Sequence, residues 1–157
     1  MKDEALTPVA FLMENLPIAR PSDGLRKTVE ATVQRLIDHT GEKHAGRQAV
    51  LDWLRVEFAV EKPSQKLQDM TSLDTNTLIA EVKKARGKHK PLSVAGLKAL
   101  KDEHVRSIVP LQTLAAQARR LEQEVAALVN AAYGLTAEEI ALMWQTAPPR
   151  MPVEPLP

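Results

Sequence analysis

The chain has 157 residues, a formal net charge of +1 and no cysteine, and it is 44% hydrophobic and 26% charged. These proportions exclude an intrinsically disordered chain, and the lack of cysteine excludes disulfides, thiolate zinc sites and cysteine nucleophiles. Only 3% of the residues are aromatic, and the apolar content is mostly Leu, Ala and Val, which favours helices over sheets. The length suits one domain and is short for a nucleotide-binding sheet with its own substrate domain. We therefore expect an all-α fold.

The expected location is cytoplasmic, without a membrane partner. No stretch approaches the roughly 18 consecutive apolar residues of a membrane-spanning helix. The first four residues, Met1 to Glu4, carry acid and lack the basic start of a signal peptide. Because the net charge is close to zero, any binding to nucleic acid would have to come from a local basic patch.

Both ends of the chain are rich in proline. Residues 1–21 contain three prolines and are predicted to form an extended lead-in after a short helical turn near Pro8–Glu14. Residues 148–157 contain five prolines and are predicted to form an extended tail. The residues between them, 22–147, are expected to form one helical module.

A long first helix is expected over residues 24–59, with Ser22 or Asp23 as its N-cap. Gly41 and Gly46 each cost about 1 kcal/mol relative to Ala inside a helix, so the segment is either one long bent helix or two stacked ones. The apolar residues that recur at three- and four-residue steps on one face are Leu25, Val29, Val33, Leu36, Ile37, Val50, Leu51, Leu54 and Phe58.

Residues 61–74 are predicted to be a connector, followed by a small helix over 74–86 that Ser72 or Asp74 caps and Gly87 ends. Ser93 is expected to cap the next helix. Pro110 would bend or interrupt that helix, because proline lacks an amide donor and clashes with the preceding turn. The predicted buried side of this helix consists of Val94, Leu97, Leu100, Val105 and Ile108.

The strictest periodicity follows Pro110, and we call these seven residues the seam. They alternate between three- and four-residue steps: Leu111, Leu114, Ala118, Leu121, Val125, Leu128 and Ala132. Such a 3.5-residue repeat is typical of a coiled coil or a tight antiparallel helix pair. The seam is therefore either intramolecular core or a partner interface, which includes a homodimer. Gly134 is predicted to end the helix, and Thr136 and Glu139 to form a capping box for a last short helix.

The expected architecture is a coiled-coil-like antiparallel pair. The helical segment over 93–133 packs against the helix over 24–59, and the small helix over 74–86 bridges one end.

The sequence indicates no catalytic residue, no metal site and no cofactor. Glu81-Val82-Lys83 is the only acid-x-Lys triplet, and we interpret it as a solvated helix end because it lacks a second acid on a neighbouring strand. The four histidines lack the four-residue step and third ligand of a helical zinc site and are interpreted as surface residues: His39, His44, His89 and His104. The chain has neither a glycine-rich phosphate loop nor a nucleophile-elbow serine.

A basic run is the better candidate for a binding site. It places five cations in eight residues without an acid: Lys83, Lys84, Arg86, Lys88 and Lys90. Such a cluster at a helix C-terminus complements the helix dipole and suits contacts with DNA phosphates. The alternative is a solvated turn.

Part of the sequence resembles a known family. The string Leu128-Val129-Asn130-Ala131-Ala132-Tyr133-Gly134-Leu135-Thr136-Ala137-Glu138-Glu139-Ile140 is similar to the closing helix of specificity regions in bacterial restriction–modification proteins, above all the carboxy-terminal part of type IIG enzymes. Residues 49–58, 61–67, 144–152 and the lead-in Leu16-Pro17-Ile18 fit the same region. The resemblance implies a helical spacer similar to that of type I specificity subunits, in which two antiparallel helices fix the separation of two recognition domains.

The chain lacks the sequence motifs that carry the catalytic activity of that family. It lacks the glycine-rich loop that binds S-adenosylmethionine, and Pro148-Pro149 is followed by Arg150 instead of an aromatic residue. The expected function is therefore that of a non-catalytic spacer that positions a recognition domain or methyltransferase on DNA. Its partners would be DNA and the methyltransferase and endonuclease domains of the same system. The alternative is a helical protein-interaction or dimerisation module that does not contact DNA.

Overall fold

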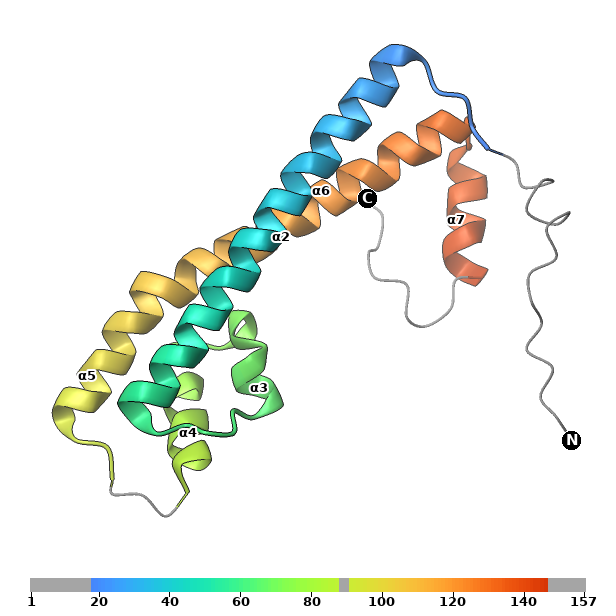
Figure 1. Cartoon of the computed structure of the whole chain (residues 1–157). Helices are drawn as coiled ribbons and strands as arrows, with labels where there is room; N and C mark the ends of the chain where they lie inside the picture. The colour runs from blue at the N-terminus through green and yellow to red at the C-terminus, as the bar shows by residue number, and fades with distance from the viewer. Residues whose placement is uncertain (1–17, 88–90, 147–157) are drawn as a thin grey trace, which may run out of the picture.

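A computed structural model describes residues 18–87 and 91–146 of the chain, and these residues form helices and no strand (Figure 1). The prediction of an all-α fold is confirmed. In chain order the elements are α2 (Asp23–Phe58), α3 (Gln65–Gln68), the 3₁₀ turn η1 (Met70–Ser72), α4 (Thr75–Arg86), α5 (Val94–Glu103), the π-helical turn η2 (His104–Ile108), α6 (Val109–Tyr133) and α7 (Ala137–Thr146). The predicted turn near Pro8–Glu14 and the tail over 148–157 lie outside the described residues.

Helices α2 and α6 form a long arm, with α3, α4 and α5 gathered around one end as a base (Figure 1). The pair is antiparallel. Gly46 lies opposite Leu111, and the Thr32 hydroxyl donates to Glu124 Oε1 at 3.3 Å. The numbers of two residues that face each other across the pair therefore add up to 156 or 157, as an antiparallel register requires. With 36 residues and a rise of 1.5 Å per residue, α2 is about 54 Å long. The predicted packing of the two long helical segments is confirmed.

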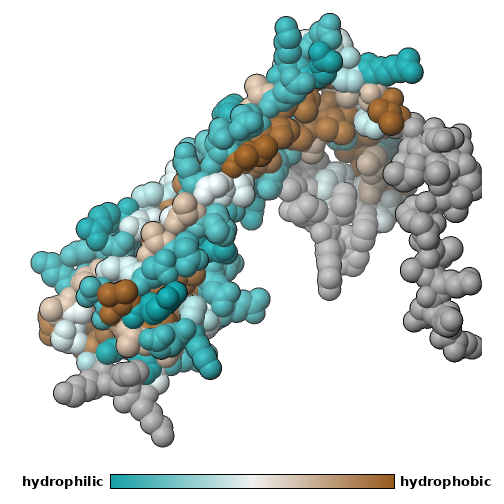
Figure 2. Space-filling view, in the orientation of Figure 1, coloured by the Kyte–Doolittle hydropathy of each residue, from teal (hydrophilic) through white to brown (hydrophobic). Residues whose placement is uncertain are grey.

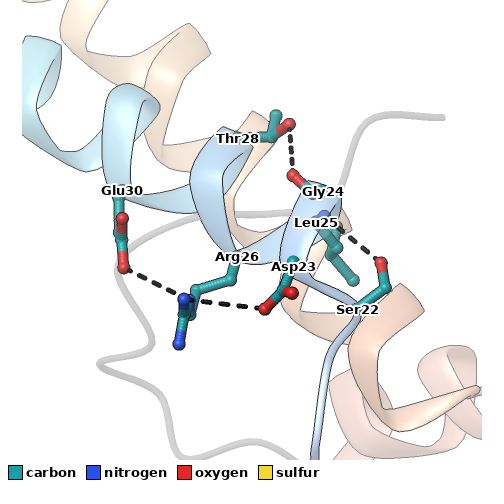
Figure 3. Close-up of polar contacts among 7 residues, drawn as sticks. All are labelled: Ser22, Asp23, Gly24, Leu25, Arg26, Thr28 and Glu30. Atoms are coloured by element: carbon teal, nitrogen blue, oxygen red, sulfur yellow. Dashed lines mark hydrogen bonds and ion pairs between the residues drawn. The ribbon is translucent and has the colours of Figure 1, made fainter.

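Helix α2 begins with a local set of polar contacts (Figure 3). Ser22, and not Asp23, is the N-cap, because its Oγ accepts a hydrogen bond of 3.3 Å from the amide of Leu25. Arg26 lies 3.6 Å from Asp23 and 3.8 Å from Glu30. These ion pairs are exposed and each contributes little to stability. The cap fixes the residue at which the chain enters the arm.

The two central glycines do not divide α2, which runs without a break from Asp23 to Phe58. The alternative of two stacked helices is therefore wrong. Gly41 has open space around its Cα, whereas a Cβ at Gly46 would lie 2.6 Å from Cδ2 of Leu111. The missing side chain at Gly46 lets α2 and α6 approach closely, and this packing offsets the low helix propensity of glycine.

Substitution of the two glycines is expected to have opposite effects. Gly46→Val overpacks the contact with Leu111 and should lower the free energy of unfolding by about 1–3 kcal/mol. Gly41→Ala meets no neighbour and should raise it by about 0.5–1 kcal/mol, because alanine has the higher helix propensity. Urea unfolding followed by circular dichroism measures both changes. Equal shifts for the two variants would contradict the close approach at Gly46.

The hydrophobic core lies in the base, and the segment over 61–74 is part of it. The largest fully buried side chains are Leu54, Leu67, Met70, Leu78, Val82, Leu100 and Ile108. Leu67 and Met70 are 0% exposed and Leu73 is 4% exposed. The segment connects α2 to α4 as predicted, but it also contributes to the core: α3 packs against α4 and α2, and η1 packs against α6. Both are too short for their apolar residues to show a helical period in the sequence.

Side-chain caps set the limits of the helices in the base. Asp74, and not Ser72, caps α4: its Oδ1 accepts from the amide of Thr77 at 2.7 Å. This hydrogen bond to the ionised form holds the pKa of Asp74 below its usual value. Gly87 follows the last turn with a φ of 56°. Ser93 caps α5, as predicted, by accepting from the amide of Gly96 at 3.1 Å.

Two residues of the predicted buried side of α5 are exposed, whereas Leu100 and Ile108 are buried as predicted. Val94 is 86% exposed, because it lies about 120° around the helix from Leu100. Val105 is 67% exposed, while its neighbour His104 is buried. In a regular helix Val105 would lie about 140° around from Leu100, and the inward face passes from Leu100 to His104 and then to Ile108 at four-residue steps.

Pro110 lies in the first turn of α6, directly after η2. A proline inside a regular helix removes one hydrogen bond and clashes with the carbonyl group of the preceding turn. The π-helical turn before Pro110 accommodates both effects, and the helix runs from Val94 to Tyr133. The predicted irregularity at Pro110 is thus a change of helical winding within a continuous helix.

Candidate functional site

The seam packs against α2 within a single chain, most tightly in its first half. Leu111, Ala118 and Leu121 are each 4% exposed, and Leu114 packs against the buried core. The remaining seam residues, Val125, Leu128 and Ala132, are only partly buried. Of the two alternatives for the seam, the intramolecular core therefore accounts for its first half. The second half is only partly covered by the described residues.

At the far end of the arm, α6 turns into α7. Gly134 has a φ of 64°, and the chain bends by 120° between the two helices. The predicted capping box is confirmed: the amide of Thr136 donates to Glu139 Oε2 at 2.8 Å, and the amide of Glu139 donates to Thr136 Oγ1 at 3.3 Å. These contacts fix where α7 begins, and α7 turns back at a wide angle to α6 (Figure 1).

An open groove of about 770 Å³ lies between the two helices, and we call it the α6–α7 groove. Its lining is mostly apolar and consists of Gln123, Ala126, Ala127, Val129, Asn130, Ala131, Leu135, Ala137, Ile140, Ala141, Met143 and Trp144. No residue of α7 is buried. Hydrophobic residues gather on this end of the arm in the space-filling view (Figure 2). A concave apolar surface with a few polar groups is typical of a binding site.

The groove was not predicted from the sequence, although a signal for it exists. The second half of α6 is apolar on two sides: Val125 and Leu128 belong to the seam, and Ala126 and Val129 line the groove. A helix that is hydrophobic around most of its circumference is normally covered on more than one side. Here Val129 remains 41% exposed.

The structure distributes the basic run over different environments. Lys83 and Lys84 are exposed in the last turn of α4. Arg86 is only partly exposed, and its Nε donates to the carbonyl oxygen of Phe58 at 2.9 Å, which ties α4 to the end of α2. Lys88 and Lys90 lie outside the described residues. A phosphate-binding role stays a prediction, and among the described residues Lys83 and Lys84 are the ones placed for it.

Glu81 is not a solvated helix end. It is 8% exposed, and the Ser64 hydroxyl donates to its Oε2 at 2.7 Å. Ser64 also caps α3 by accepting from the amide of Leu67 at 3.3 Å. Glu81 therefore fixes the start of α3 against α4, a structural role that local sequence did not reveal.

His104 is not a surface residue either, since it is only 6% exposed. Its Nε2 lies 2.9 Å from the carbonyl oxygen of Leu73, and its Nδ1 lies 3.2 Å from the hydroxyl of Thr75. Because the carbonyl only accepts, Nε2 carries a proton and donates. Of the other histidines, His44 is exposed as predicted, His39 is only partly exposed, and His89 lies outside the described residues.

Glu103 completes the polar junction between α5 and η2. Partial burial raises its pKa, but hydrogen bonds from Ser107 and Arg106 outweigh this effect and hold the pKa below its usual value. Glu103, Arg106 and Ser107 lie within one and a half turns of the same helix, so their hydrogen bonds stabilise the π-helical turn. Within residues 18–87 and 91–146, no group of three or more His, Asp or Glu side chains is placed to hold a metal ion.

No single helix among the described residues is long and apolar enough to cross a membrane. Val94–Tyr133 and Ala137–Thr146 satisfy the criteria of length and composition only as a pair, across their bend of 120°.

The geometry defines a class of protein: an all-α protein with a two-helix arm, a small base and an apolar groove at the far end. Residues 22–129, 108 of the 157, match a family model described as a domain of unknown function (DUF8810), and the chain belongs to this family. No curated protein and no solved structure shows significant similarity to the chain. The family description names no activity, so the resemblance to restriction–modification enzymes stays a prediction.

Proposed function

We propose that the protein is a non-catalytic helical spacer. The observation that carries this proposal is the arm: α2 spans about 54 Å and packs along α6 in one antiparallel register. The base braces one end of the arm through a buried core. Such a rod holds whatever is attached at its two ends at a fixed separation.

The more specific form of the proposal is a spacer in a restriction–modification system, where it positions a recognition domain or methyltransferase on DNA. This form depends on the resemblance of residues 128–140 to specificity regions. Lys83 and Lys84 support it, because both are exposed at the C-terminus of α4, where no acidic residue follows before the end of the basic run. In this arrangement the base lies against the DNA backbone and makes contacts that do not depend on sequence.

The double variant Lys83→Gln/Lys84→Gln is expected to flatten the salt dependence of DNA binding. Each lost phosphate contact should reduce the slope of log K against log salt concentration by up to about 0.9. Fluorescence anisotropy of a labelled DNA duplex, titrated with the full chain at several salt concentrations, measures this slope.

The matched control is Lys98→Gln/Lys101→Gln, which removes two exposed lysines from α5 and leaves the basic run intact. Equal slopes for the wild-type chain and the Lys83/Lys84 variant, or no DNA binding by the wild-type chain, would overturn the DNA form of the proposal. The spacer itself would then have to act between protein partners.

The second candidate function, a protein-interaction module without DNA contact, is favoured by one observation. Among the described residues the apolar groove between α6 and α7 is open, and Leu142 and Met143 are 59% and 51% exposed. An amphipathic helix that fills a hydrophobic groove is a common mode of recognition.

A further inference from the structure

We propose that the α6–α7 groove is a docking site for the chain's own amino-terminal segment, residues 6–16. This inference does not rest on the spacer function. It follows from three observations: the exposure of α7, the end of the arm at which α2 begins, and the spacing of apolar residues in the segment.

Helix α7 needs a covering partner. It has ten residues, none of them buried, and an isolated helix shorter than about 12–15 residues is marginal in water. Its capping box satisfies only its N-terminal amides. Ile140, Ala141 and Trp144 face the groove, and a further layer over them would bury apolar surface on α6 and α7 together.

The amino-terminal segment reaches the arm at the same end as the groove. Since facing residue numbers add up to 156 or 157, Ser22 lies level with Gly134, where α6 gives way to α7. Figures 1 and 3 show α2 beginning at this end of the arm. The five residues 17–21 span at most about 17 Å when extended. That tether allows residues 6–16 to reach the groove, whereas the core of the base lies most of the length of α2 away.

The sequence of the segment fits an apolar groove. Leu6, Val9, Met13 and Leu16 recur at steps of three, four and three, which places them on one side of a helix. Thr7 and Pro8 are favourable N-cap and N1 residues, and Pro17 follows the pattern, where a helix would have to stop.

The dimensions and lining of the groove also agree with this occupant. The nine residues that would be helical after the Thr7 cap, 8–16, are about 14 Å long, and the ten residues of α7 are about 15 Å long. Five alanines line the groove: Ala126, Ala127 and Ala131 from α6, and Ala137 and Ala141 from α7. Their small side chains leave room for leucine and for methionine, whose flexible side chain fills irregular space.

The test uses two properties of the full chain: it has no cysteine and only two tryptophans. Trp144 lines the groove and Trp53 packs on Phe58 in the base. In the variant Ala10→Cys, a bimane fluorophore on the new thiol sits at the edge of the apolar side of the segment. Tryptophan quenches bimane only on contact. Emission is expected to be several-fold lower than in the same labelled chain with Trp144→Phe.

Two controls make the result specific. In Asn15→Cys the label lies about 160° around the helix from Met13 and should be quenched much less. In Ala10→Cys with Met13→Asp, a charge on the docking side should release the segment and restore the emission. Circular dichroism verifies that every variant keeps the helical content of the wild-type chain.

The source of the quenching is then determined by mixing. Quenching that is unchanged when the labelled chain is diluted into excess unlabelled Trp144→Phe chain supports docking within one chain. Quenching that disappears on such mixing would overturn the proposal, because the groove would then take the segment of a second copy. Equal emission with and without Trp144 would also overturn it and leave the groove to another partner.

Discussion

Leu121→Asp is expected to unfold the arm and not to release a folded monomer from an oligomer. Leu121 is 4% exposed within one chain, in the seam that packs on α2. A carboxylate at this position would be buried without a partner, which costs at least about 3 kcal/mol in addition to the lost apolar contact. Since a domain is stable by only about 5–15 kcal/mol, a large loss of helical circular dichroism and a shifted urea midpoint are expected.

The neighbouring residue supplies the control. Arg120 is exposed on the same turn of α6, so Arg120→Asp introduces the same side chain without burying it and should change stability by no more than about 0.5 kcal/mol. Size-exclusion chromatography with light scattering completes the test. A folded Leu121→Asp chain with a lower mass than the wild type would show that the seam is an interface between chains.

Leu67→Ala is the second substitution with a large expected effect. Leu67 is 0% exposed in α3, within the segment whose sequence suggests a mere connector. Truncation of a fully buried leucine leaves a cavity and should lower the free energy of unfolding by about 2–5 kcal/mol. Urea unfolding at equilibrium measures this change.

Lys66→Ala is the matched variant, because Lys66 is exposed in the same short helix. It should alter stability by less than about 0.5 kcal/mol. If both variants lowered the free energy of unfolding by the same small amount, α3 would not contribute to the hydrophobic core of the base.

Features that depend on neighbours in sequence could be predicted. Ser22, Asp74, Ser93 and Thr136 cap helices because each oxygen meets an amide two or three residues later. The first half of the seam was predictable for a similar reason: a sustained 3.5-residue repeat requires a facing helix. Since the helix over 24–59 was the only other one of comparable length, the pairing followed.

Features that depend on tertiary contacts could not be predicted. Glu81 and His104 have ordinary surface character in sequence, and they are buried because Ser64, Thr75 and the carbonyl group of Leu73 meet them from other elements. The π-helical turn between α5 and α6 is a further feature that no periodicity rule anticipates.

The α6–α7 groove escaped prediction for a different reason. Its shape depends on the 120° bend between the helices, and the capping signals at Gly134 and Thr136 mark where the chain turns without giving the direction. The basic run shows a further limit, since proximity in sequence did not keep Arg86 beside Lys83 and Lys84: its guanidinium group binds the carbonyl oxygen of Phe58.

The π-helical turn η2 divides one continuous helix into two parts that pack on different partners. Before it, α5 packs chiefly on α4, and after it, α6 packs chiefly on α2. The extra residue resets the phase of one continuous helix between these two surfaces. Each half of the helix therefore packs on its own partner in its own register, although the backbone between the two halves is unbroken.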